Sequence, residues 1–136
     1  MTTTITEAPH LEIVAYIDRD FQARFADRVK LACTLAGGVN FAQLARAMTD
    51  HTGREYSRNQ VVNVAGRTDV DANRSRISLE KAQDVVDTFA EHYALCYARK
   101  DGSAGRPVDL DWFVAEHPTM LTRHIPGYPN DLVLAA

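Results

Sequence analysis

Residues 40–67 read NFAQLARAMTDHTGREYSRNQVVNVAGR and contain two short segments that each open with a helix-capping side chain. Asn40 opens the first segment and Ser57 the second, and a glutamine follows each three residues later, which is the spacing of a reciprocal capping box. Glycine commonly closes helices, and one glycine follows each segment: Gly53 and Gly66. The pattern predicts a helix, a turn over residues 52–56 and a second helix.

The second segment has an apolar side and a side of distinctive polar composition. The small apolar residues that could anchor it on a core are Val61, Val62, Val64 and Ala65. Arginine can bind guanine through two hydrogen bonds, asparagine and glutamine can bind adenine in the same way, and serine can bond to either base. The second helix of a helix-turn-helix places its N-terminal residues against base edges in the major groove. We therefore expect base contacts from Ser57, Arg58, Asn59, Gln60 and Asn63.

Other polar residues near the two segments are candidates for contact with the DNA backbone. Asn40, Gln43 and Arg54 stand at a predicted helix start or at the turn, where a side chain can reach a phosphate. Arginines beyond the second segment would add salt-sensitive affinity with little choice of sequence; these are Arg67, Arg74 and Arg76. The predicted partner is double-stranded operator DNA. The alternative is a small helical bundle in which Asn40 and Ser57 only cap helices and the arginines are only solvated.

Composition and charge limit the classes of protein that fit. The chain has 136 residues, 46% of them hydrophobic and 24% charged, which suits one compact domain and excludes a wholly disordered chain. The formal net charge of −3 argues against a nucleic-acid partner. However, residues 40–81 hold seven basic and five acidic residues, so the paired segments lie in the basic part of the chain.

Neither a metal site nor an enzyme is indicated by the residue pattern. Cys33 and Cys96 lack the spacing of zinc ligands, and we expect them to be reduced thiols in the core. The five histidines are scattered, with no HExxH motif and no glycine-rich phosphate loop. The acidic residues Asp84, Asp87 and Glu91 are interpreted as a solvated helix face. We expect no catalytic residues, no metal and no cofactor.

No membrane or export signal is visible in the sequence. No apolar run approaches the roughly 20 residues of a membrane span, and residues 1–7 have no basic start followed by an apolar core. We therefore expect no membrane partner and a location in the bacterial cytoplasm, on DNA.

Helical spacing of apolar residues predicts an all-α fold, a small helical bundle with a flexible C-terminal tail that contains one short helix. The expected parts are a flexible N-terminus over 1–8, a helical DNA-binding domain over 9–100, a linker over 101–107, and a short helix with a mobile tail over 108–136. Within the domain, one long helix of about five turns is expected from Ser78 to Cys96 or Tyr97. The short helix near 109–117 is expected to dock only weakly through Trp112 and Phe113.

The paired segments also resemble the lambda-repressor-like helix-turn-helix family. The residues that carry the resemblance are Leu44-Ala45, Thr52-Gly53-Arg54 and the run from Ser57 to Arg67, and it covers about residues 20–97. The stretch between Ala45 and Val61 is longer than the compact family pattern. Members of this family are small helical DNA-binding domains, often dimeric regulators of phage or bacterial promoters. The resemblance implies a homodimer whose second helices reach successive half-sites about 34 Å apart.

A narrower resemblance concerns the whole chain and its C-terminus. The chain is similar to immunity repressors of the integration-dependent type found in some temperate mycobacteriophages. Its terminal residues Leu134, Ala135 and Ala136 resemble the end of bacterial ribosome-rescue tags that ClpXP-type proteases recognise. In repressors of that type, integration of the phage genome removes the tag, so the shortened protein accumulates and maintains lysogeny. The alternative is a small-residue terminus that only looks like a degradation tag.

Three hypotheses follow for function. The first is a sequence-specific transcriptional repressor, of the phage immunity type, that binds its operator through residues 57–67 and is degraded through its C-terminal tag. The second is a host regulator or antitoxin of the same fold, in which the tail binds a partner. The third is a helical protein-interaction module that does not bind DNA.

Overall fold

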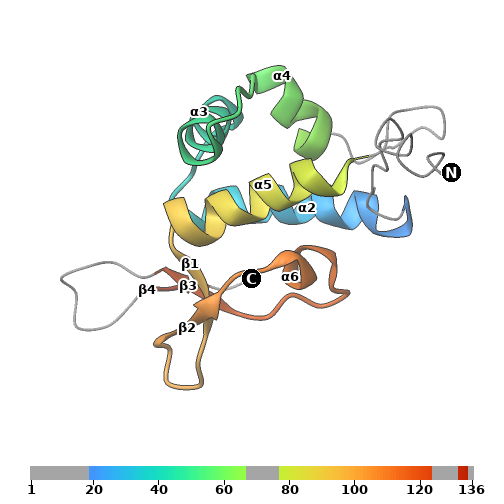
Figure 1. Ribbon diagram of the computed structural model, residues 1–136. Helices are drawn as coiled ribbons and strands as arrows, with labels where there is room; N and C mark the ends of the chain where they lie inside the picture. The colour runs from blue at the N-terminus through green and yellow to red at the C-terminus, as the bar shows by residue number, and fades with distance from the viewer. Residues whose placement is uncertain (1–18, 67–76, 124–131, 135–136) are drawn as a thin grey trace, which may run out of the picture.

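The computed structural model describes residues 19–66, 77–123 and 132–134 and combines helices with an antiparallel sheet (Figure 1). The expected all-α fold is therefore wrong, and the protein belongs to the α+β class. Figure 1 shows three tiers: α3 (Phe41–Thr52) and α4 (Arg58–Val61) lie on one side of α2 (Arg19–Leu35) and α5 (Leu79–Asp87), and the sheet with α6 (Leu110–Val114) lies on the other side. In the described part of the chain, no helix has the length and apolar character needed to cross a bilayer.

The helical part follows the predicted order. The described α-helices are α2, α3, α4, α5 and α6. Two of them continue with π-helical winding: α4 into η2 (Val62–Gly66) and α5 into η3 (Thr88–His92). Ser78 caps α5 as expected, because its side chain accepts a hydrogen bond from the Lys81 N–H.

The expected long helix over residues 78–97 is wrong in its last turn. The Tyr93 N–H closes the final π turn on the Thr88 carbonyl at 3.1 Å. Ala94 then adopts a left-handed φ of 54°, which turns the chain out of the helix. Cys96 and Tyr97 consequently lie in strand β1 (Leu95–Ala98). Their spacing fits a helix equally well, so pattern alone could not separate the two.

The sheet has four short strands in the order β2-β1-β3-β4, all antiparallel. Besides β1, they are β2 (Ala104–Pro107), β3 (Leu121–Arg123) and β4 (Leu132–Leu134). β1 pairs with β3 in the register Cys96 to Thr122, and β3 pairs with β4 in the register Leu121 to Leu134. Residues 121–123 and 132–134 therefore form strands, although both segments were expected to lie in a mobile tail.

The segment 101–107, which was expected to be a linker, forms the turn and the return strand of a hairpin. The Arg99 N–H donates to the Ser103 carbonyl at 2.8 Å, and the Gly102 N–H donates to the Arg99 carbonyl at 2.8 Å. At Gly105, a Cβ atom would lie 2.8 Å from the Tyr97 carbonyl oxygen, so only glycine lets the two strands approach this closely. Glycine here serves strand pairing rather than flexibility.

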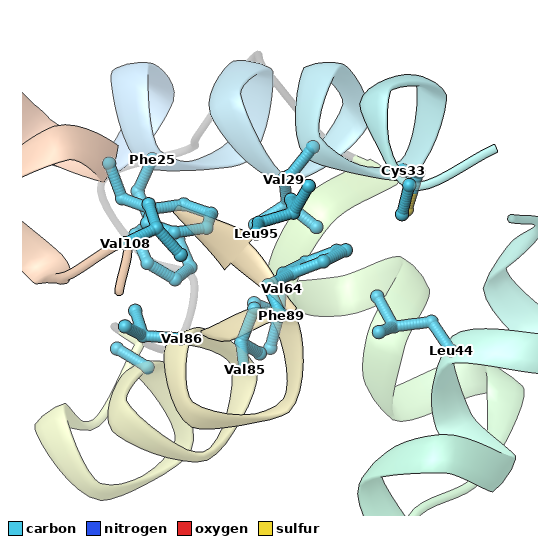
Figure 2. Close-up of a cluster of buried hydrophobic side chains, with 14 of the residues drawn as sticks. Phe25, Val29, Cys33, Leu44, Val64, Val85, Val86, Phe89, Leu95 and Val108 are labelled. Carbon is cyan, nitrogen blue, oxygen red and sulfur yellow. The ribbon is translucent and has the colours of Figure 1, made fainter. Parts of the chain in front are cut away.

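The core is shared between the helices and the C-terminal half of the chain. Figure 2 shows Phe25 and Val29 of α2 facing Val85 and Phe89 of α5 and η3, with Leu95 of β1 among them. The expected weak docking of α6 (Leu110–Val114) is also wrong, because Trp112 and Phe113 are buried. The ring centroids of Phe25 and Phe113 are 5.5 Å apart, and those of Phe89 and Phe113 are 5.9 Å apart.

Two arginines of α2 fasten α6 to the helical tier. The buried guanidinium of Arg28 donates to the Trp112 carbonyl and, at 2.6 Å, to the Ala115 carbonyl. Arg24 donates to the Val114 carbonyl at 2.7 Å. These are carbonyls at the end of α6 that have no partner within the helix. The C-terminal half is thus joined to α2 by hydrogen bonds as well as by the core.

We predict that Phe89→Ala lowers the free energy of unfolding by about 3–5 kcal/mol, because it removes a fully buried ring that contacts Phe113 and leaves a cavity. Urea unfolding followed by circular dichroism measures the change. The control is Phe21→Ala, whose ring is 38% exposed, and it should cost less than about 1 kcal/mol. Equal losses in the two variants would contradict the placement of the core.

Candidate nucleic-acid interface

Both predicted capping boxes are confirmed. In α3, the Asn40 Oδ1 accepts from the Gln43 N–H at 2.8 Å, and the Gln43 Oε1 accepts from the Asn40 N–H at 2.9 Å. In α4, the Ser57 Oγ accepts from the Gln60 N–H at 3.2 Å, and the Gln60 Oε1 accepts from the Ser57 N–H at 2.7 Å. Each helix therefore begins at a residue that its own side chains determine.

The turn between the two helices is held by short-range hydrogen bonds. Gly53 ends α3 with a left-handed φ of 78°, and its N–H donates to the Thr49 carbonyl at 3.0 Å. The Tyr56 N–H donates to the Thr49 Oγ1 at 2.9 Å, and that hydroxyl in turn donates to the Ala45 carbonyl at 3.0 Å. Thr49 therefore connects the end of the turn back to α3.

A buried carboxylate on α5 fixes the outer side of the same turn. The Arg54 Nη1 donates to both oxygens of Asp84 at 2.8 Å, and the Tyr56 hydroxyl donates to the Asp84 Oδ2. The Asp84 side chain is only 8% exposed, whereas that of Arg54 is 52% exposed. Burial and the hydrogen bond to Asp84 raise the pKa of Tyr56, so its hydroxyl remains a donor at neutral pH.

The π-helical continuation of α4 keeps one face buried and another exposed. Val61 and Val64 are buried against the core, and Leu44 of α3 belongs to the same cluster. Arg58, Asn59 and Asn63 are exposed. None of these three side chains has an ion pair or a hydrogen bond with any residue in the described part of the chain. They form a polar set on α4 and η2 that makes no hydrogen bond or ion pair with the described part of the chain.

The structure places the site residues predicted from the sequence in different surroundings. Arg58, Asn59 and Asn63 are exposed together on α4 and η2. In each of the four capping residues, the side-chain oxygen accepts one backbone N–H at a helix start; these residues are Asn40, Gln43, Ser57 and Gln60. Arg54 binds Asp84 through Nη1, and its side chain is 52% exposed. Arg67, Arg74, Arg76, Ala135 and Ala136 lie outside the described residues, and Leu134 ends β4.

Sequence reasoning missed Asp84 and Tyr56. Asp84 was interpreted as part of a solvated face, which is wrong, because it is 6% exposed. A signal was present in the sequence, since Asp84 stands between apolar residues of α5 that are all buried: Ala82, Val85 and Val86. A carboxylate next to such a stripe needs a cationic or hydroxyl partner, and only the fold shows that Arg54 and Tyr56 supply it.

A hollow of about 560 Å³ lies where α2, the start of α3 and the start of α4 meet. Its lining residues are Lys30, Cys33, Thr34, Val39, Asn40, Phe41, Ala42 and Arg58. Burial raises the pKa of the Cys33 thiol to about 12, so this cysteine is an uncharged, weakly reactive part of the lining. In the described part of the chain, no group of three or more acidic, histidine or cysteine side chains is arranged to hold a metal ion.

Comparison with protein families, with curated proteins and with solved structures found no match to this chain.

We predict that Asp84→Asn lowers the free energy of unfolding by about 1–3 kcal/mol, since it removes the charge that binds Arg54 and Tyr56. The matched control is Asp87→Asn on the same helix, whose hydrogen bond with Gln83 is exposed; it should change stability by less than about 0.5 kcal/mol. Denaturant unfolding of both variants at neutral pH makes the comparison. Identical midpoints for the two would show that Asp84 does not anchor the turn.

Proposed function

We propose that this protein binds double-stranded DNA sequence-specifically through α4 and acts as a transcriptional repressor. One observation carries the proposal: Arg58, Asn59 and Asn63 are exposed on a helix that is fixed in place by the residues around its start. Their side chains have no hydrogen bond or ion pair with the described residues. A held helix matters because base recognition needs hydrogen-bonding groups at set positions. The capping box at Ser57 and the Asp84 anchor supply that constraint.

Each element has a role in this proposal. The start of α4 enters the major groove, where Arg58 suits guanine, and Asn59 and Asn63 suit adenine. α3 lies across the DNA backbone, with the Asn40 and Gln43 side-chain amides as donors to phosphate. Their oxygens are occupied by the cap, but their NH2 groups remain donors. The Gln60 NH2 group has the same freedom, while its oxygen holds the Ser57 N–H.

The proposed regulatory role rests on the resemblance to lambda-repressor-like proteins and, more narrowly, to phage immunity repressors. A repressor of this kind occupies an operator and blocks access to the promoter. The proposed C-terminal tag includes Leu134, which pairs with Leu121 in the sheet. A protease that pulls on this terminus would therefore have to separate β4 from β3. Deleting residues 134–136 should raise the protein level in cells if the tag is a degron, and leave it unchanged if the tail binds a partner.

We predict that the full chain recovers a defined sequence from a pool of random duplex DNA and that Arg58→Ala weakens binding to that sequence by about 1–3 kcal/mol. The preference should relax mainly at one base pair, because one side chain reads it. Arg99→Ala is the matched control, since Arg99 is an exposed arginine in the turn between β1 and β2. Gln60→Ala is a poorer choice, because it would also break the capping box.

The outcomes separate the hypotheses. Recovery of two inverted half-sites would show a dimer on DNA, as the resemblance implies. Recovery of a sequence whose binding is equally sensitive to Arg58→Ala and Arg99→Ala would contradict a role for α4. Failure to enrich any sequence would favour the protein-interaction module, which requires no DNA.

A further inference from the structure

The hollow beside the start of α4 has the charge of an anion site. Lys30 of α2 and Arg58 of α4 both line it, and none of the described residues that line it is acidic. Neither cation has an ion pair with a carboxylate among the described residues. The contrast is with Arg54 and Arg106, each of which has a carboxylate partner. Two positive groups from different helices thus converge on one open space, and no carboxylate of the described residues neutralises either of them.

The position of the hollow connects it to the proposed recognition helix. Arg58 is both the first residue of α4 and part of the lining, and Asn40 at the start of α3 is part of the lining as well. The hollow is open to solvent rather than enclosed. The positive end of the 12-residue helix α3 also faces it, through Phe41 and Ala42. A ligand here would lie directly beside bases that α4 contacts.

We infer that this hollow seats a phosphodiester of the DNA backbone, and that Lys30 is a DNA-contacting residue. The inference rests on the proposed function. A phosphodiester carries one negative charge and is accessible on the surface of DNA. One also adjoins every nucleotide whose base lies in the groove. It suits an open cationic hollow better than a small metabolite does, because metabolites are usually bound in sites that bury most of their surface. Lys30 was not among the residues expected from the sequence.

Lys30 and Arg58 therefore differ in what they contribute. Lys30 neutralises a phosphate, so its loss should weaken binding to all sequences alike and reduce the salt dependence. Arg58 lies between the hollow and the groove, and its loss should change sequence preference as well as affinity. Because of this difference, phosphate contact by Lys30 can be tested separately from base recognition by α4.

The test compares Lys30→Gln with Lys100→Gln in the full chain, using the duplex recovered from the random pool and a scrambled duplex. Lys100 is an exposed lysine in the turn between β1 and β2. At about 0.15 M salt, Lys30→Gln should weaken binding to both duplexes by the same factor, about two- to fivefold, as for a solvent-exposed ion pair. The slope of log K against log salt should fall by about 0.9, and Lys100→Gln should change neither quantity.

A second measurement locates the contact on the DNA. Neutral methylphosphonate linkages are placed one at a time along the recovered duplex. One linkage beside the base read by Arg58 should weaken binding of the unsubstituted protein, and it should weaken binding of Lys30→Gln less, because the charge pair between Lys30 and that phosphate is already lost. An unchanged affinity and salt slope in Lys30→Gln, or equal sensitivity of both proteins at every linkage, would overturn the assignment.

The remaining outcomes are also decisive. If inorganic phosphate binds the protein and Lys30→Gln abolishes that binding while leaving DNA affinity intact, the hollow is a small-anion site and the inference is wrong. If no duplex is recovered from the pool at all, the proposed function itself fails, and the Lys30 assignment fails with it. If a duplex is recovered and Arg58→Ala relaxes its sequence preference, the proposed function stands whatever Lys30→Gln shows.

Discussion

The buried carboxylate of Asp84 makes the contacts on which the arrangement of α3 and α4 depends. It sits on α5 and binds both Arg54 and Tyr56, which belong to the turn between α3 and α4. A turn of this length has many accessible conformations, and local hydrogen bonds from Thr49 and Gly53 restrict only its start and end. The carboxylate fixes the turn against the core of the protein. It thereby sets the angle at which α4 presents Arg58 and Asn59.

The rest of the fold keeps α5 in place. Phe89 continues α5 into the core, where it meets Phe113 of α6, and Arg28 of α2 binds the carbonyls at the end of α6. The sheet carries Leu95 and Leu121 into the same core. The C-terminal half is therefore a support for the helix-turn-helix rather than an appendage to it. A proposed DNA-binding surface made of only two short helices needs such support, because short helices derive most of their stability from packing.

Local sequence rules predicted the helix-turn-helix well and the C-terminal half poorly. Asn40, Ser57 and Gly53 act on residues within four positions, so their capping roles could be predicted from spacing alone. Strands β3 and β4 have three residues each and are stabilised by distant partners, so they carry too little pattern to be recognised. The partners of Asp84 lie 28 and 30 residues away in the sequence. Lys30 could not be predicted either, because only the folded chain brings it to the same hollow as Arg58.

The most direct test of DNA binding through α4 is a map of backbone amide signals by NMR as the full chain is titrated with the duplex recovered from random DNA. We expect the largest changes on residues 57–63 and on the start of α3 near Asn40, with little change in the hairpin of β1 and β2. Changes concentrated in the sheet and α6, with α4 unaffected, would contradict the claim that α4 reads the DNA.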